Sequence, residues 1–230
     1  MFDILNIDSG SPWFFFLSIL PLLLRGLVVT IAAAGIGYVI AVVLGLLFAI
    51  VRRSSGRVIS LTLAGVLEFI RDTPLLIQLF FLYYALPAYG IRIPGFAVGA
   101  LAIGLQYSAY LAEVYRGGIE AVPADQWDAA LSLQLSKWQI YRDVIVPQVI
   151  PRILPTMGNY LASILKETPV LSTISVFEMF SLAIFIGDRT YQYVIPLTAA
   201  AVLMLALTNL VAFVTNILEQ RLPRRGISLR

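Results

Sequence analysis

The 230-residue chain contains no cysteine and no histidine. Without cysteine it has no disulfide framework, no thiolate metal site and no cysteine nucleophile. Without histidine it lacks imidazole catalysis and the commonest ligand of zinc and haem. Charge is also scarce, since 13% of the residues are Asp, Glu, Lys or Arg, against about 25% in an ordinary soluble domain. These absences argue against a soluble single-domain enzyme.

Hydrophobic residues make up 60% of the chain, compared with about 45–50% in soluble domains. So little charge cannot cover a globule of this size with polar surface, and a composition this apolar does not suit a disordered chain. The net charge of +3 does not indicate nucleic-acid binding, because the basic residues lie at the ends of apolar runs. The composition therefore predicts a multi-spanning membrane protein.

Five apolar runs are long enough to cross a membrane, which takes roughly 20 helical residues for about 30 Å of hydrocarbon. They are residues 27–51, 61–84, 95–115, 152–176 and 193–218. A shorter run, residues 12–24, is expected to form a short N-terminal interfacial helix or an extension of the first span. It lacks the basic start and small-residue cleavage site of a signal peptide. The sequence thus predicts an all-α membrane protein with five transmembrane helices.

The basic residues are distributed unevenly between the two ends of these runs. One side carries Arg52, Arg53, Arg57, Arg116, Lys137, Arg142, Arg152, Arg221, Arg224, Arg225 and Arg230, and the other carries Arg25, Arg92 and Arg189. Loops rich in Lys and Arg stay in the cytoplasm. We therefore expect a multi-pass protein of the cytoplasmic (inner) membrane, with the N-terminus outside and the C-terminus inside.

The longest connection on the cytoplasmic side, residues 117–151, carries helix signals instead of the Gly, Ser or charge of a simple linker. Ser136 with Gln139 three positions later matches a capping box, in which the serine hydroxyl and the glutamine side chain satisfy the first backbone N–H groups. We expect two short helices joined near Gln134, the second ending at Pro147.

The residue pattern of this loop leaves two interpretations open. Asp128-Ala129-Ala130 places two small side chains on the first helix, where another protein could approach closely, and Trp127 and Trp138 flank it as anchors. The same tryptophans would also suit an amphipathic hairpin that rests on the lipid headgroups.

The loop is similar to the EAA loop of ABC-transporter permease subunits, which carries the helix that sits in a cleft of the ATPase subunit. The matching residues are Asp128, Ala129, Ala130, Gln134, Ile145 and Pro147. Further blocks, in order along the chain, resemble the polar amino-acid uptake permeases of the histidine, glutamine and arginine type. These blocks are residues 24–30, 68–80, 108–118, 122–127 and 166–168. The resemblance covers residues 20–218.

This resemblance implies the fold of a type I ABC importer permease. It implies an extracytoplasmic or interfacial segment at residues 1–24, a five-span permease domain at residues 25–218 and a basic cytoplasmic tail at residues 219–230. The implied partners are ABC ATPase subunits, a second permease subunit, identical or homologous, and an extracytoplasmic solute-binding protein. The residues implied in coupling to the ATPase are Trp127, Asp128, Ala129, Ala130, Gln134 and Pro147.

Three residues of the loop depart from the family pattern, and one of them is Asp125, which stands where Gly often precedes Gln-Trp. Asp128 stands where Glu is usual and keeps the charge on a shorter side chain. Gln134 stands where Gly is usual, at a turn that commonly needs a positive φ, which Gln adopts less readily than Gly.

Two spans carry the same basic–acidic–Thr–Pro motif, at residues 71–74 and at residues 166–169. Proline removes a backbone hydrogen bond, so each span should kink at its motif, and the threonine hydroxyl can satisfy a freed carbonyl. Ionisable groups at membrane depth are expensive, roughly 2.5–3.5 kcal/mol each on insertion scales. Their presence needs a reason.

Two explanations for these charges stay open: they neutralise one another as internal ion pairs, or they line the solute path. The candidates for the path are Glu68, Arg71, Thr73, Gln78, Lys166 and Glu167. Glu113 is expected to pair with Arg116 at a helix end, and Gly95 with Gly99 fits a helix-packing pattern.

The chain has no Gly-x-x-x-x-Gly-Lys-Ser/Thr phosphate loop. We therefore expect a transport subunit and no enzyme, with no catalytic residue, metal or cofactor of its own and with ATP bound by a partner. Beyond the proteins implied above, the expected partners are an amino-acid substrate and membrane lipid, and no nucleic acid. The alternative function is an ion-gradient-driven carrier or channel that acts without an ATPase.

Overall fold

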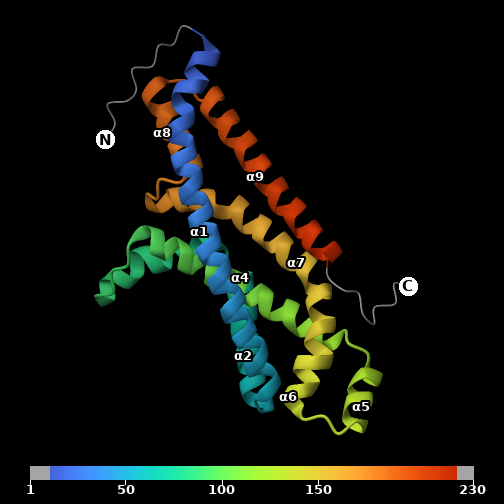
Figure 1. The fold of residues 1–230 in the computed structure, drawn as a ribbon. Helices are drawn as coiled ribbons and strands as arrows, with labels where there is room; N and C mark the ends of the chain where they lie inside the picture. Colours follow the sequence, from blue (N-terminus) through green and yellow to red (C-terminus); the bar gives the residue numbers. More distant parts are fainter. Residues whose placement is uncertain (1–10, 222–230) are drawn as a thin grey trace. The chain divides into compact units, whose positions relative to one another are not determined.

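The computed structural model describes residues 11–221, and within this range it contains helices and no β-strand (Figure 1). The helices are α1 (Pro12–Ser54), α2 (Arg57–Asp72), α3 (Leu75–Phe80), the π-helix η1 (Phe81–Ala85), the 3-10 helix η2 (Leu86–Tyr89), α4 (Gly95–Glu120), α5 (Ala124–Ser132), α6 (Lys137–Gln139), the π-helix η3 (Ile140–Ile145), α7 (Val146–Glu167), the 3-10 helix η4 (Thr168–Ile174), α8 (Met179–Thr190) and α9 (Val194–Arg221). The predicted all-helical class is confirmed.

The chain divides into two compact units, which we describe separately. Unit 1 contains the described parts of residues 1–38, 74–103 and 163–210, and unit 2 those of residues 39–73, 104–162 and 211–230. The predicted outer segment and the basic tail lie partly outside the described residues.

Among the described residues, three helices are long and apolar enough to cross a membrane, namely α1, α4 and α9. A fourth candidate is the pair formed by residues 137–174 and α8, which is bent by 50°. Four of the five predicted runs thus have a counterpart. The run at residues 61–84 has none, because its helix is interrupted in the middle.

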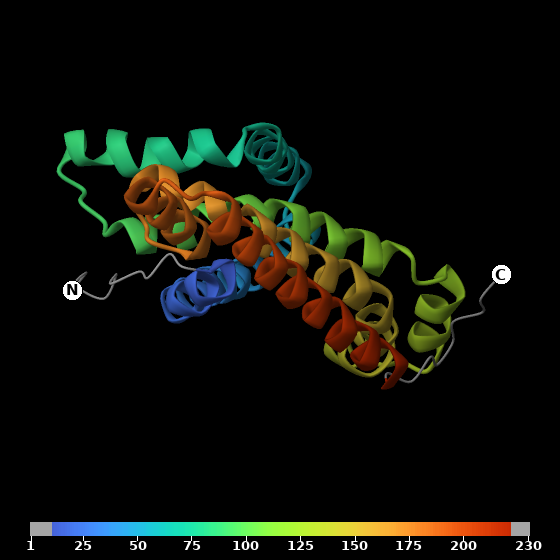
Figure 2. The same cartoon turned by 90° about the horizontal axis from the view of Figure 1, so that it is seen from above.

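The first span is longer than the sequence indicates. Residues 12–24 do not form a separate interfacial helix; they are the first part of α1, which has 43 residues. In unit 1 this part lies beside α8 (Figures 1 and 2), where Phe15, Ile19 and Leu23 are buried in one apolar cluster with Met179 and other residues of α8. Their four-residue spacing keeps all three on one helix face, so tertiary packing extends the helix.

The first basic–acidic–Thr–Pro motif ends α2 at Asp72, and α3 begins only at Leu75. Thr73 is extended, with ψ 125°, and its hydroxyl donates a hydrogen bond of 2.7 Å to the carbonyl of Phe69. The break predicted at Pro74 is confirmed, whereas a single helix through residues 61–84 is wrong.

The second motif ends α7 at Glu167, and the chain continues as the 3-10 helix η4. The hydroxyl of Thr168 donates a hydrogen bond of 2.8 Å to the carbonyl of Leu165. This break is confirmed as well, and in both motifs the threonine satisfies a carbonyl of the last helical turn, as predicted.

The start of α7 corrects another prediction, because the helical run does not end at Pro147. The π-helix η3 leads directly into α7, and the N–H of Val146 bonds to the carbonyl of Tyr141, five residues back. Pro147 follows this π-helix at the second position of α7 and has no N–H to donate to the preceding turn. The wider π turn therefore carries the chain past the proline.

Helix α8 was not predicted, because its 12 residues are too few for a span. Its N-cap is Glu178, which is 0% exposed and accepts hydrogen bonds from the N–H groups of Phe180 (2.9 Å) and Ser181 (2.6 Å). The hydroxyl of Thr30 on α1 lies 3.3 Å from the same carboxylate. A Cβ at Gly26 would lie 2.7 Å from the Cα of Met179, so this glycine allows the close approach of α8.

Gly99 on α4 serves the packing role predicted for it. A Cβ at this position would lie 2.6 Å from a methyl carbon of Leu171 on η4. The small side chain therefore allows two helical segments of unit 1 to meet.

Candidate functional site

The loop between α4 and α7 belongs to unit 2 and consists of two helical pieces joined by a tight turn (Figure 1). The predicted capping box is present: the N–H of Gln139 donates to Ser136 Oγ (3.4 Å), and the N–H of Ser136 donates to Gln139 Oε1 (2.9 Å). The predicted junction is also confirmed, since Gln134 lies between α5 and α6. The second piece, however, continues into α7 and is no separate helix.

Gln134 adopts the left-handed conformation, with φ 53°. This is the conformation expected for the glycine that usually stands here, and for an L-residue it costs about 1–2 kcal/mol. The chain therefore keeps the family's turn geometry with a residue that is strained in it.

The residues implied in coupling are not equally accessible. Asp128, Ala129, Gln134 and Pro147 are exposed, whereas Ala130 is buried. The small-residue pair thus offers only one of its two alanines to a partner.

Three large apolar side chains of the loop are exposed: Leu131 (60%), Leu133 (74%) and Trp138 (70%). Leu131 and Leu133 were missed by the sequence reasoning, which weighed the small residues next to them. An apolar residue directly after the small pair was the available signal. Exposed apolar groups in a polar loop are typical of a surface that binds another protein or the membrane.

Trp127 is held inside unit 2. The guanidinium of Arg53, at the end of α1, lies 5.1 Å from the Trp127 ring centroid, and the Tyr141 ring meets Trp127 edge-on at 5.5 Å. Arg53 Nε also donates a hydrogen bond of 2.5 Å to the Tyr141 hydroxyl. Trp127 therefore fixes α5 to α1 and η3, and of the two predicted anchors Trp138 is the exposed one.

Two polar contacts tie the loop to α7. Gln148 Nε2 donates a hydrogen bond of 3.1 Å to Gln126 Oε1, and Arg152 donates one to the carbonyl of Ala121. Together with the Trp127 cluster, they hold the first half of α5 and the residues before it against the rest of unit 2.

Glu113 forms the helix-end pair that was predicted, with Arg116 at 2.8 Å. It also pairs with Arg52 of α1, and Arg116 in turn pairs with Glu120 at 2.5 Å. The partner Arg52 was not predicted, because 61 residues separate it from Glu113 and a sequence pattern carries no such information.

The six candidates for the solute path divide between the units. Unit 2 holds Glu68, Arg71 and Thr73, and unit 1 holds Gln78, Lys166 and Glu167. Of the charged ones, Glu68, Lys166 and Glu167 are exposed, and Arg71 is half-buried.

Arg71 has the most distinctive surroundings of these residues. Its Nε is buried and has no hydrogen-bond partner among the described residues. Its carbonyl accepts a hydrogen bond of 3.2 Å from the Tyr110 hydroxyl, and the Tyr110 ring lies 5.6 Å from that of Tyr160. Within residues 11–221 no ion pair of 4.0 Å or less joins Arg71 to Glu68, so this pair does not neutralise itself there.

Comparisons with known proteins agree with one another. Residues 41–224 match the family described as binding-protein-dependent transport system inner membrane component. The chain is 50% identical over 224 residues, 97% of each chain, to a Sinorhizobium fredii protein described as a probable amino-acid ABC transporter permease, y4tG. Among solved structures, a chain of an amino acid ABC transporter crystallised with histidines has a TM-score of 0.83 and 36% identity, covering 90% of this chain and 98% of that one.

A chain of the methionine ABC transporter MetNI, in an inward-facing conformation, covers the same shares with a TM-score of 0.73 at 17% identity, which shows a similar fold. The family match spans far more than half of the chain. This protein therefore belongs to the binding-protein-dependent transport system inner membrane components, which are permease subunits of ABC transporters and not enzymes themselves.

Proposed function

We propose that the chain is the permease subunit of an importer that carries a polar amino acid and takes its energy from a separate ATPase bound to the loop between α4 and α7. The observation that carries this proposal is the surface of that loop. Leu131, Leu133 and Trp138 are exposed around a turn that keeps the family's left-handed conformation, and they offer an apolar surface for a partner protein.

The partners follow from the family. The ATPase binds the ATP, a second identical or homologous permease completes the path, and a solute-binding protein delivers the substrate. The excess of Lys and Arg on the side of this loop supports a cytoplasmic location for it, with the N-terminus outside. The loop then faces the compartment that holds ATP.

The substrate class is supported by the relatives. The y4tG protein is described as an amino-acid permease, and the structure with 36% identity was obtained with histidines. A zwitterionic substrate needs both signs of charge along its path. Glu68, Arg71, Lys166 and Glu167 supply them, and Thr73 and Gln78 add uncharged polar side chains.

The decisive experiment replaces the exposed leucines of the loop. In the reconstituted complex, Leu131→Ala combined with Leu133→Ala should lower co-purification of the ATPase and substrate-stimulated ATP hydrolysis about tenfold, because truncation of apolar interface residues commonly costs 1–2 kcal/mol in total. Folding is not expected to change, since both side chains are exposed and few internal contacts are lost.

Leu61→Ala is the matched control, because Leu61 on α2 is 61% exposed and lies outside the loop. It should leave ATPase binding unchanged. Accumulation of substrate against a gradient by the chain without any ATPase would contradict the proposal and favour an ion-gradient-driven carrier.

A further inference from the structure

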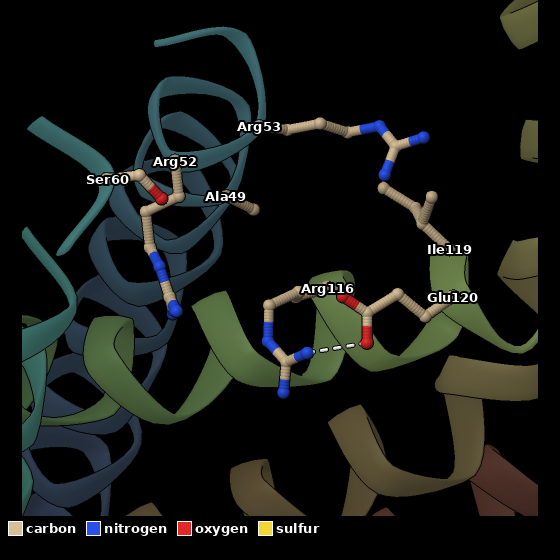
Figure 3. Close-up of a pocket in the computed structure, with 7 residues that line it drawn as sticks. All are labelled: Ala49, Arg52, Arg53, Ser60, Arg116, Ile119 and Glu120. Carbon is tan, nitrogen blue, oxygen red and sulfur yellow. Dashed lines mark hydrogen bonds and ion pairs between the residues drawn. The ribbon is translucent and has the colours of Figure 1, made fainter. Parts of the chain in front are cut away.

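A cavity of about 280 Å³ lies at the end of α1, within unit 2 and outside the loop surface described above. Its walls come from α1, α2 and α4 (Figure 3), and they include Arg52, Arg53, Ser60, Arg116 and Glu120. Three guanidinium groups around one cavity suit an anionic ligand.

The charges around this cavity do not cancel. Arg116 pairs with Glu120 and Glu113, and Arg52 pairs with Glu113, so two carboxylates face three guanidinium groups. Arg53 carries the surplus, because its contacts are the neutral rings of Trp127 and Tyr141 and the Tyr141 hydroxyl.

Arg52 adds a second guanidinium group to the wall of the cavity. Its Nε is buried and has no hydrogen-bond partner among the described residues, and the same burial closes this atom to a ligand in the cavity. The cavity thus has one surplus positive charge, which Arg53 carries.

These features match a phosphodiester better than free phosphate. A phosphodiester carries one negative charge, whereas a phosphate monoester or free phosphate carries about −1.5 to −2 at pH 7. Its oxygens can also accept parallel hydrogen bonds from a guanidinium fork.

Exposed apolar side chains lie within one helical turn of the lining residues along both α1 and α2. Leu46, Leu47 and Ile50 on α1 and Val58 and Ile59 on α2 are all exposed. Apolar side chains next to a basic cavity, at the end of a helix long enough to span a membrane, suit acyl chains beside a headgroup.

We propose that this cavity binds the phosphodiester headgroup of an anionic phospholipid of the phosphatidylglycerol type, with the acyl chains along the exposed apolar side chains of α1 and α2. Arg53 contributes the surplus charge, and Arg52 lines the same cavity. The lipid headgroup would therefore lie against the arginine that also contacts Trp127.

The test is native mass spectrometry of the full chain in detergent, with phosphatidylglycerol, phosphatidylcholine of the same acyl chains, or inorganic phosphate added. Phosphatidylglycerol should stay bound, and phosphatidylcholine should not. Arg53→Gln should weaken phosphatidylglycerol binding about fivefold, the effect of one basic residue near an anionic lipid surface. Arg53→Lys should bind nearly as the unchanged chain does.

Two matched controls separate charge from structure. Arg57→Gln removes an exposed arginine of the same region that does not line the cavity, and it should weaken binding clearly less than Arg53→Gln does. Ser60→Asp places a negative charge in the wall without touching the contacts of Arg53 and should weaken binding, whereas Ser60→Asn should not. Equal binding of both phospholipids, an equal effect of Ser60→Asp and Ser60→Asn, or displacement of the lipid by equimolar inorganic phosphate would overturn the proposal.

Discussion

The two basic–acidic–Thr–Pro motifs end their helices in different ways. After α2, Thr73 is extended (φ −85°, ψ 125°) and Pro74 precedes a new α-helix. After α7, Glu167 stays close to the helical region (φ −92°, ψ −13°) and a 3-10 helix follows. The same four residue types therefore determine that the α-helix ends, but not the direction in which the chain continues.

Burial differs between the motifs as well. Thr168 is 0% exposed, whereas Thr73 is only half-buried. Arg71 is half-buried and its Nε has no hydrogen-bond partner within residues 11–221, whereas Lys166 is exposed. The comparison indicates that the second motif contributes more to stability, through its threonine. The first motif contributes more to transport, through its cation.

The largest expected effect is on transport. Arg71→Ala should lower the initial rate of amino-acid uptake by the reconstituted complex about tenfold or more, because a hydrogen bond to a charged group contributes about 1.5–3 kcal/mol. Lys166→Ala should have a smaller effect, since that side chain is exposed. Uptake of labelled substrate is measured, and membrane abundance is followed by immunoblot.

Arg71→Lys keeps the charge and should retain part of the transport that Arg71→Ala loses. If Arg71→Ala lowers membrane abundance as much as uptake, then Arg71 serves the stability of the bundle and the proposed path is wrong at this residue.

The next largest effect is on stability, and here a change in the second motif is expected to matter more than a change in the first. Thr168→Val should lower the free energy of unfolding by about 1 kcal/mol. The substitution keeps the shape of the side chain nearly unchanged but removes its buried hydrogen bond. Thr73→Val should cost a few tenths of that, since Thr73 is only half-buried. Thermal unfolding in detergent distinguishes the two, and equal costs would mean that burial does not separate the motifs.

The smallest effect concerns a third helix end, that of α5, where no proline acts. Gln134→Gly should raise the free energy of unfolding by roughly 0.5 kcal/mol, because relief of the left-handed strain is partly offset by the greater freedom of glycine in the unfolded chain. Gln134→Val should lower it, since a β-branched residue is poorest at positive φ. The same unfolding measurement applies, and a destabilised Gln134→Gly variant would show that the glutamine side chain matters more than its backbone.

Local chemistry explains what could be predicted. The capping box at Ser136, the turn at Gln134 and both threonine–proline breaks depend on atoms within about four residues of one another, and all are present. The resemblance to ABC-transporter permeases rests on blocks of adjacent residues, and the family match confirms it.

The failures concern contacts between distant residues. The length of α1 and the existence of α8 depend on each other through the cluster around Phe15 and Met179. The inward position of Trp127 depends on Arg53, and the pairing of Glu113 with Arg52 spans 61 residues. No pattern within a single helix contains these pairings.

The sequence by itself determined the membrane class, the family, the two threonine–proline breaks and the turn and capping box of the loop. Only the tertiary structure decided which apolar side chains of the loop face outward. It also decided which arginines of the described residues keep a charge without a counter-ion or an N–H without an acceptor. The reason is the distance along the sequence between the interacting residues. Helix caps and proline breaks are set by neighbouring residues, whereas the burial and charge pairing of a side chain are set by the distant segment that packs against it.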